Sequence, residues 1–381
     1  MQKYNLIVVS PEPFPYGQAA TNRLLSYLTG IAENKAVLYL CLAAPSKTPC
    51  LNLTKRGIYK KIHYRYLIDP NTTYKQSKLL RAATLILRNI TLVLSLLCCY
   101  TCRSILVYTT DKRIINSVLL VSRLKKNKVF RDITELVGYN YKKDLDAVMS
   151  MKCDMAKLSG LITISTGIYE YFENLTADKK FLLPVLVDAT RFKSVIKKEK
   201  YVFVCSGANL ERDGLLDSLN GFLLFSKQYP DYVFEIASSL NLNDPYHKRC
   251  KDLIDKNSDS IHWLGSLPSY EIPEKMAHAS ALMLTPHANY KTKGFPTKLG
   301  EYLMSATPVI CSTIDDLEDI IYQSIVYAVP PNSPSMIADK LQYIISHPIE
   351  AHEIGYKARR YMEENYTIKS FKSSLMDFLD I

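Results

Sequence analysis

Short runs of apolar, largely β-branched residues alternate with amphipathic segments along this chain, and the alternation begins twice. The first series starts with YNLIVVS at residues 4–10, and the second starts with YVFVCSG at residues 201–207. Strands that are apolar on both faces are typical of a parallel sheet covered by helices on each side. The sequence therefore predicts an α/β protein built from two Rossmann-like, doubly wound parallel-sheet domains.

The boundary between the two series lies in a basic polar stretch at residues 191–200. A length of 381 residues also exceeds what one ordinary core supports, which favours two domains. We place an N-terminal domain at residues 1–192 and a C-terminal domain at residues 200–366. Paired domains of this kind bind ligands in the cleft that they face, at the carboxyl ends of their strands.

Charge is distributed unevenly between the two halves. The whole chain has a net charge of +11, but residues 1–198 contain 31 Lys and Arg against 13 Asp and Glu, and the remainder has a net charge of −7. A basic half fits a polyanionic substrate, anionic lipid or nucleic acid. Because no helix-turn-helix, zinc-finger or RNA-binding signature accompanies the charge, we expect no nucleic-acid partner.

The cysteines and the N-terminus indicate a cytoplasmic protein. The nine cysteines include one C-x-x-C, from Cys99 to Cys102, but no second pair and no histidines at metal-ligand spacing. We interpret them as buried, unreactive thiols in a reducing compartment. The N-terminal apolar run is only about five residues long, which predicts a strand rather than a signal peptide.

The stretch KGFPTKLGEYLMSATPVICS, residues 293–312, carries the clearest ligand signal. Pro296 suits the first position of a helix, and the free N–H groups of the next three residues then favour a phosphate. Glu301 follows Thr297 by four residues, on the same face of that helix. Its carboxylate can accept hydrogen bonds from two hydroxyls at once, as a ribose would offer. This layout fits a nucleoside diphosphate with a sugar attached.

Other nucleotide sites have little support in the sequence. No G-x-G-x-x-G follows the first strand of either series, and the chain has no P-loop. The first loop contains the single Gly17, and the loop after residues 201–205 contains Gly207 and Gly214 at a different spacing. We therefore expect neither nicotinamide nor ATP chemistry and no cofactor.

Five segments of this chain resemble the retaining GT-B glycosyltransferases of family 4 (glycosyl transferases group 1), of the type found in capsule and exopolysaccharide gene sets. The likeness runs nearly from end to end, and its carriers are PFPYGQAATNRLLSYLTGIAEN, ITISTGIYEYF, LPVLVDATRF, IHWLGSLPSYEIPEKMAHASALMLTP and GFPTKLGEYLMSATPVI. The resemblance implies a GT-B fold, with residues 367–381 packed back on the N-terminal domain. It also implies transfer of a sugar, with retention, from a UDP- or GDP-sugar to a saccharide or lipid-linked saccharide acceptor in cell-surface polysaccharide biosynthesis.

The resemblance also assigns roles to residues of the C-terminal domain. Glu301 matches the ribose-binding second Glu of the family's E-x7-E motif, whereas Lys293 stands in place of the first Glu and could face a diphosphate or an acidic sugar. Ala208 stands where the family has an Arg, so we assign Arg212 and Lys298 to neutralise the diphosphate. The whole expected donor-binding set is Gly17, Gly207, Arg212, Lys293, Gly294, Phe295, Pro296, Thr297, Lys298, Leu299 and Glu301.

In the N-terminal domain, two features are expected at the cleft. Gly17 fits a loop whose backbone approaches the diphosphate closely. Glu135 follows the strand pattern FRDIT and is our candidate for contacting the acceptor or donor sugar, so the expected catalytic residues are Glu135, Lys298 and Arg212. No D-x-D stands at a strand end of this domain, which fits an enzyme that needs no bound metal.

Two other functions stay open at this point. A GT-B sugar-nucleotide epimerase would act on the donor without an acceptor, but the C-terminal domain lacks the expected pair of acid and base carboxylates. A non-catalytic partner subunit of a glycosyltransferase is suggested by Lys293, Ala208 and Asp213, which depart from the family's pattern.

Residues 76–99 predict a helix with one narrow polar stripe, formed by Ser77, Arg81, Thr84, Arg88, Thr91 and Ser95. Arg81, Arg88 and Asn89 interrupt the apolar run, which leaves it shorter than the roughly 20 apolar residues that span a bilayer. The helix is either packed beside the sheet with its stripe outward or laid into a lipid interface. The basic first half favours lipid, so we expect a peripheral contact with the anionic inner face of the plasma membrane.

Overall fold

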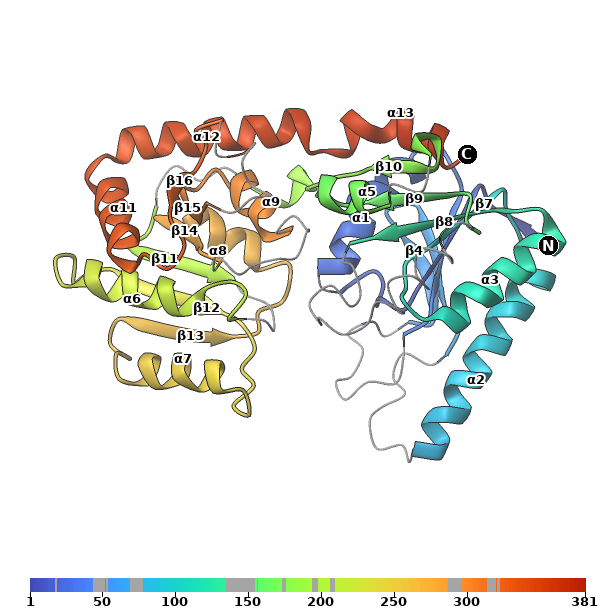
Figure 1. Cartoon of the computed structure of the whole chain (residues 1–381), viewed down its shortest axis with the longest axis horizontal. Coiled ribbons are helices and arrows are strands. Elements are labelled where there is room, and N and C mark those ends of the chain that lie inside the picture. Colours follow the sequence, from blue (N-terminus) through green and yellow to red (C-terminus); the bar gives the residue numbers. More distant parts are fainter. Residues whose placement is uncertain are drawn as a thin grey trace. The chain divides into compact units, whose positions relative to one another are not determined.

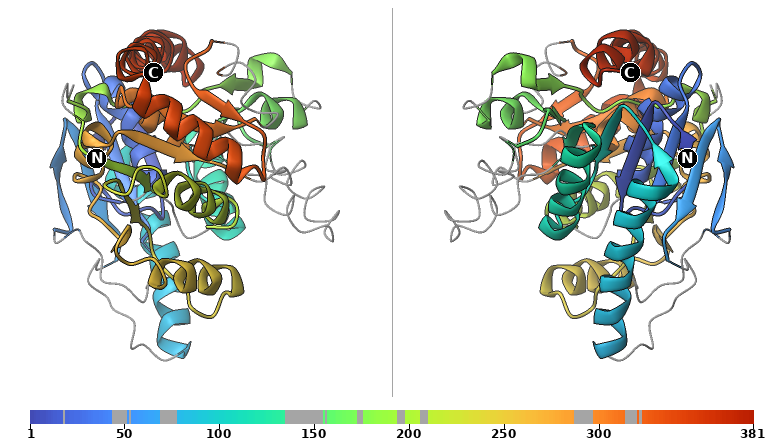
Figure 2. Two further views of the ribbon diagram at one scale, coloured as in Figure 1. Left: turned by 90° about the vertical axis from the view of Figure 1, so that its left-hand side faces the viewer. Right: turned by 90° about the vertical axis from the view of Figure 1, so that its right-hand side faces the viewer.

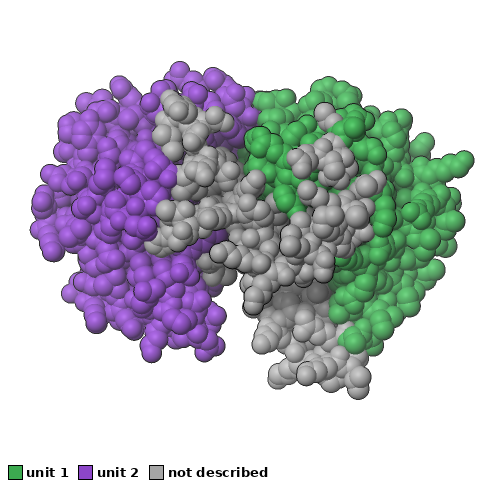
Figure 3. Space-filling model, viewed as in Figure 1, with its two compact units in different colours: residues 1–186, 292–294, 368–381 green, residues 187–291, 295–367 purple. Residues whose placement is uncertain are grey.

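The structure is a computed structural model that describes residues 1–17, 19–43, 52, 54–68, 78–134, 155, 157–172, 176–193, 198–205, 210–286, 297–313, 320 and 323–381. The chain divides into two compact units (Figures 1 and 3). The first unit contains Met1–Leu186 and Ile368–Ile381, and the second contains Val187–Lys291 and Phe295–Thr367. The domain bounds that we expect from the sequence, residues 1–192 and 200–366, stay a prediction.

An eight-stranded sheet forms the centre of the first unit, in the order β10-β9-β8-β7-β2-β3-β5-β4. Its strands are parallel except for the β4–β5 pair. Every residue of β2 and β3 is buried, as expected for strands covered on both faces. The strands are β2 (Leu6–Ser10), β3 (Val37–Cys41), β4 (Arg56–Tyr59), β5 (Ile62–Tyr66), β7 (Ser104–Val107), β8 (Lys128–Ile133), β9 (Gly160–Thr163) and β10 (Lys180–Leu182). The separate strands β1 (Gln2–Lys3) and β6 (Tyr100–Thr101) pair with each other.

The helices of the first unit are α1 (Ala19–Ala32), α2 (Lys78–Leu94), α3 (Lys112–Lys125), α5 (Thr166–Tyr171) and α13 (Ile368–Phe378). The last of these, α13, packs against α1 (Figure 1). Gly30 makes the contact possible, because a Cβ there would lie 2.6 Å from Ile368 Cγ1. Leu375 and Leu379 are buried in the same core, and Ser104 Oγ donates to the Leu379 carbonyl at 2.6 Å.

The second unit contains a six-stranded parallel sheet in the order β13-β12-β11-β14-β15-β16. Numbered within the unit, this order is 3-2-1-4-5-6, that of a doubly wound dinucleotide-binding fold, and it reverses between β11 and β14. The strands are β11 (Tyr201–Cys205), β12 (Val233–Ala237), β13 (Ile261–Gly265), β14 (Ala281–Leu284), β15 (Val309–Ser312) and β16 (Tyr327–Val329). The helices are α6 (Leu215–Ser226), α7 (Pro245–Asp255), α8 (Ile272–His278), α9 (Thr297–Met304), α11 (Pro334–Ser346) and α12 (Pro348–Asn365).

Helix α2 departs from one alternative and from one expectation. The alternative of a polar stripe that faces outward does not hold, because Arg88 and Ser95 are buried. In addition, the apolar segment Ala82–Cys99, which runs through the π-helical turn Ser95–Cys99, is long and apolar enough to cross a membrane by length and composition alone. Our expectation that this run is too short was therefore wrong.

The cysteines also correct one expectation. Cys41, Cys250 and Cys311 are buried, and burial raises the pKa of the Cys311 thiol to about 12. Cys98 and Cys99, however, are exposed at the end of the π-helical turn. The prediction of buried thiols is thus wrong for these two residues.

Candidate functional site

The reversal point of the second sheet brings together the loops that follow β11 and β14. Gly214 caps the start of α6 with a φ of 70°, and a Cβ there would lie only 1.6 Å from the Thr285 carbonyl oxygen. Thr285 Oγ1 in turn donates to the Gly214 carbonyl at 3.0 Å. Only glycine allows this approach, so the residues before α6 are fixed against the end of β14.

Two cations share one buried carboxylate at this point. Asp213 Oδ2 is ion-paired with the Lys298 ammonium, and Asp213 Oδ1 accepts from Arg212 Nε at 3.4 Å. Arg212 and Lys298 are half-buried. The three side chains sum to one positive charge beside the carboxyl ends of β11 and β14, where open α/β sheets bind ligands.

Helix α9 supplies further groups to the same region. It begins at Thr297, so the N–H groups of its first turn have no partner within the helix. The side chain of Leu299 is fully buried in the unit's interior, which leaves only its backbone for a ligand. Lys298 and Glu301 are three residues apart and therefore neighbours on the helix surface.

Glu301 is held by an arginine from far earlier in the chain. Arg191 Nη1 donates to Glu301 Oε1 at 2.5 Å, and Arg191 Nη2 donates to the Ser269 carbonyl at 3.1 Å. Arg191 ends a single helical turn, Ala189–Arg191, which is capped by the Asp188 side chain. Within the part of the chain that the structure describes, no partner is found for Glu301 Oε2, the oxygen that would accept a ligand hydroxyl.

In the first unit, Gly17 lies in the loop between β2 and α1. A Cβ at this position would lie 2.0 Å from Thr21 Oγ1, which donates to the Pro13 carbonyl at 2.7 Å. Glycine is therefore required for the packing of this loop onto the start of α1, whatever ligand its backbone meets.

Asp132, near the end of β8, is committed to the interior of the first unit. Its carboxylate accepts from Arg23 Nε at 3.0 Å, from Arg23 Nη2 at 3.0 Å and from the Tyr27 hydroxyl at 3.0 Å. Arg23 also donates to the carbonyls of Leu183 and Pro184. The cluster is buried and joins α1, β8 and the segment after β10, so we regard Asp132 as structural.

Six of the expected site residues lie outside the described residues: Glu135, Gly207, Lys293, Gly294, Phe295 and Pro296. The structure brings together Arg212 and Lys298 in the second unit, and it places Glu301 one helical turn from Lys298. Among the described residues, no group of three His, Cys, Asp or Glu side chains could hold a metal ion.

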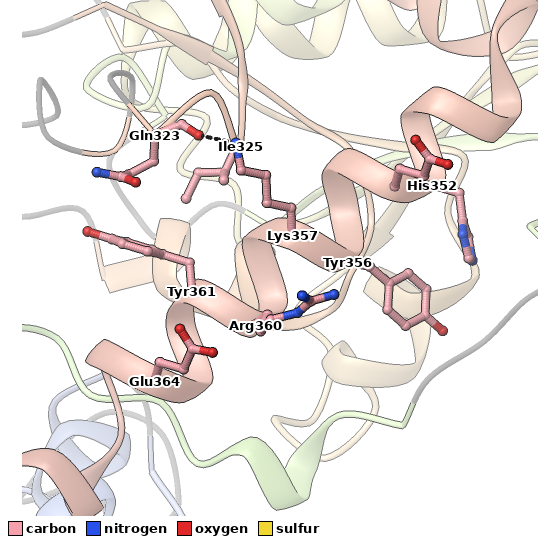
Figure 4. A pocket seen from close by; sticks show the side chains of 9 residues that line it. Gln323, Ile325, His352, Tyr356, Lys357, Arg360, Tyr361 and Glu364 are labelled. Carbon is pink, nitrogen blue, oxygen red and sulfur yellow. Dashed lines mark hydrogen bonds between the residues drawn. The ribbon is translucent and has the colours of Figure 1, made fainter.

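A separate cavity of about 510 Å³ lies beside α12 in the second unit (Figure 4). Its lining includes His352, Tyr356 and Arg360 of α12, together with Gln323, whose carbonyl accepts from Lys357 Nζ at 2.8 Å. Gln323 precedes β16, which places the cavity at the amino ends of the strands. It is therefore distinct from the cation cluster at the carboxyl ends.

The roles of two residues at the candidate site, Asp213 and Arg191, could not be found from the sequence. The sequence identified Asp213 as a departure from the family's pattern, but not as the partner that Arg212 and Lys298 share. It gave Arg191 no role, although Arg191 lies in the segment LPVLVDATRF, which carries the family resemblance. Arg191 and Glu301 are separated by 110 positions. Such a pairing leaves no periodic signal in a single sequence, so only the folded chain shows it.

The whole fold matches that of GT-B glycosyltransferases. Similar solved structures include sucrose-phosphate synthase from Thermosynechococcus elongatus, with 14% identity, 98% of both chains covered and a TM-score of 0.73. Anabaena Alr3699/HepE in complex with UDP and glucose has 11% identity, 99% of both chains covered and a TM-score of 0.73. A glycosyltransferase from Rickettsia africae ESF-5 has 14% identity, with 100% of this chain and 98% of that chain covered and a TM-score of 0.69.

Within this fold, the second unit carries the family signal. Residues 187–361 match the family described as Glycosyl transferases group 1. No curated protein matches the sequence. The expected α/β GT-B fold is thus confirmed, and the Arg212–Asp213–Lys298 cluster and Glu301 both lie inside the matched segment.

Proposed function

We propose that the protein is a glycosyltransferase that moves a sugar from a nucleotide-sugar donor to a saccharide acceptor. The observation that carries the proposal is the cluster of Arg212, Asp213 and Lys298 at the reversal point of the second sheet. This cluster lies in a segment that matches Glycosyl transferases group 1. The two cations would neutralise the phosphates of a nucleoside diphosphate bound at this end of the sheet.

The reaction places its main electrostatic demand on the leaving group. As the bond between the anomeric carbon and the diphosphate oxygen breaks, negative charge develops on the diphosphate, while the acceptor oxygen forms the new bond. Lys298, Arg212 and the free N–H groups at the start of α9 would stabilise that charge. Asp213 keeps the two cations in place before the donor binds, because each of them is ion-paired to its carboxylate.

Glu301 is the residue we propose for the ribose of the donor. Arg191 occupies one of its oxygens and fixes the direction of the carboxylate. The second oxygen can then accept from a ribose hydroxyl. Arg191 is therefore a positioning residue, which acts on the donor through Glu301.

The donor is a UDP- or GDP-sugar, and UDP is the first base to test because a structural neighbour, Anabaena Alr3699/HepE, is complexed with UDP and glucose. We further propose that transfer retains the anomeric configuration, as in family 4. The acceptor we propose is a lipid-linked saccharide in the biosynthesis of capsule or exopolysaccharide, for which the basic first half of the chain is the supporting observation.

The test is release of the nucleoside diphosphate from a panel of UDP-, GDP- and ADP-sugars, with and without lipid-linked saccharide acceptors. The proposal expects release that depends on an acceptor. Release without any acceptor would instead indicate an epimerase or hydrolase, and no release with any pair would indicate a non-catalytic partner subunit.

The same assay tests the metal requirement. Because protein cations and the start of α9 supply the positive charge, activity should survive excess EDTA. Loss of activity that Mg²⁺ or Mn²⁺ restores would contradict this expectation.

A further inference from the structure

Helix α2 exposes an apolar face, the reverse of what a helix on a water-exposed surface shows. Its exposed large side chains are Ile86 (63%), Leu87 (60%), Ile90 (50%) and Leu94 (53%). Every exposed residue among 82–99 is Ala, Ile, Leu or Cys. These positions recur at the spacing of one helical face, so they form a continuous apolar strip along α2.

One polar side chain of α2, that of Arg88, is turned toward the first unit instead. Arg88 is buried and donates to the Leu42 carbonyl at 3.2 Å and to Asp111 Oδ2 at 3.4 Å. Leu92 and Leu96 are buried beside the same stripe. The helix is thus attached to the unit by its mixed face, and its purely apolar face has no partner among the described residues.

Helix α3 lies beside α2 (Figure 2). It adds both apolar and basic groups. Leu120 and Leu124 are 59% and 69% exposed, one helical turn apart. Arg113, Arg123 and Lys126 are also exposed. Residues 70–130 contain eleven Lys and Arg but a single acid, Asp111, which is itself paired with Arg88 and Arg113.

We propose that α2 and α3 form a docking surface for an anionic lipid bilayer, with the apolar strip of α2 lying in the interface and the basic side chains of α3 facing lipid phosphates. A bilayer interface of this kind binds aliphatic side chains flanked by Lys and Arg, because burial of the apolar side chains and attraction of the basic ones to anionic lipid both contribute to the binding free energy. The excess of Lys and Arg over acidic residues in this region favours an anionic bilayer over a protein partner, because a protein surface of mixed charge would not be matched by basic side chains alone. The proposal does not depend on the proposed activity.

The helix lies on the bilayer and does not cross it. Crossing would remove Leu92 and Leu96 from their buried positions and would separate Arg88 from Asp111 and the Leu42 carbonyl. An unpaired arginine in the middle of a bilayer is costly, whereas the same arginine is paired when α2 stays on the protein.

Co-sedimentation with vesicles tests the surface directly. The full chain should bind vesicles of phosphatidylcholine mixed with phosphatidylglycerol, ignore pure phosphatidylcholine, and dissociate as salt is raised. The double variant Leu87→Gln with Ile90→Gln, and separately Arg123→Gln with Lys126→Gln, should each weaken binding by about tenfold or more. Matched controls on exposed positions of the second unit, Leu242→Gln with Ile349→Gln and Lys248→Gln with Lys256→Gln, should bind as the parent does.

A fluorescent reporter distinguishes docking from self-association. Trp263 is the one tryptophan, so a Leu87→Trp, Trp263→Phe chain reports on α2 alone. Its emission should shift to the blue on mixed vesicles, and a Leu242→Trp, Trp263→Phe control should not shift. The proposal is overturned if the parent ignores mixed vesicles at low salt, or if the α2 variants bind them unchanged. It is also overturned if Leu87→Gln with Ile90→Gln only converts a dimer to a monomer.

Discussion

At the scale of single residues, Asp213 and Arg191 explain how a site with altered motif positions can still be organised. Asp213 holds both Lys298 and Arg212, and Arg191 holds Glu301. The Asp213 carboxylate therefore fixes two cations, and the Glu301 carboxylate is fixed by one, before any ligand binds. Preformed geometry of this kind lowers the cost of ordering side chains on binding.

Glu301→Gln tests the ribose contact. The change keeps the size of the side chain but weakens its acceptance of hydrogen bonds by about 1.5–3 kcal/mol, or roughly 10- to 100-fold in kcat/KM. Steady-state kinetics of the purified variant checks this result, with Glu274→Gln, an exposed residue of α8, as the matched control. Parental kcat/KM in a folded Glu301→Gln protein would remove Glu301 from the donor site.

At the scale of elements, Gly214 connects the start of α6 to the end of β14. Gly214→Ala should lower the free energy of unfolding by about 1–3 kcal/mol or more, because the new Cβ both strains the backbone and meets the Thr285 carbonyl. Gly265→Ala is the matched control, since Gly265 has a φ of 72° but open space around its Cβ position. Thermal unfolding should therefore show a larger loss for Gly214→Ala, and equal losses would contradict the close contact.

The elements themselves were largely predictable from the sequence. The apolar runs at YNLIVVS and YVFVCSG became β2 and β11, and GFPTKLGEYLM gave a helix from Thr297 to Met304. Which face of α2 packs on the first unit was not predictable, because the spacing of its polar stripe fits a stripe that faces solvent as well as one that faces the protein. Its direction depends on Asp111 and the Leu42 carbonyl, which lie far along the chain.

The same limit applies to the candidate site. Lys298 and Glu301 could be found because they share a short helix with a recognisable start. The pairing of Glu301 with Arg191 and of Lys298 with Asp213 depends on how distant loops meet at the reversal of the second sheet. The spacing of residues in the sequence alone does not predict those contacts.

At the scale of the whole molecule, Lys198 links stability to pH. It donates to the Ala277 carbonyl at 2.6 Å and to Thr307 Oγ1 at 2.8 Å, and burial lowers its pKa from 10.5 to about 8. Between these values the unfolded chain binds one more proton at this residue than the folded chain does. The contribution of Lys198 to the free energy of unfolding therefore rises as pH rises through the window, and it is lowest below about pH 8.

A comparison with Lys198→Met isolates this effect from other titrating groups. The Tm of the parent minus the Tm of the variant should increase with pH across that window. Lys227→Met, an exposed residue after α6, should give a difference that does not change with pH. A parent-minus-variant difference that falls with pH would show that the Lys198 ammonium is stabilised, and not penalised, by its surroundings.

The central claim is that the second unit binds the diphosphate of a nucleotide sugar at the Arg212–Asp213–Lys298 cluster. Isothermal calorimetry with UDP and GDP tests it most directly, using the parent, Lys298→Met and the surface control Lys227→Met. The account predicts that parent and control bind alike and that Lys298→Met binds about 10- to 100-fold more weakly, because one charge-assisted contact to phosphate is lost. Equal affinity of Lys298→Met and the parent, or no binding of either nucleotide by the parent, would contradict it.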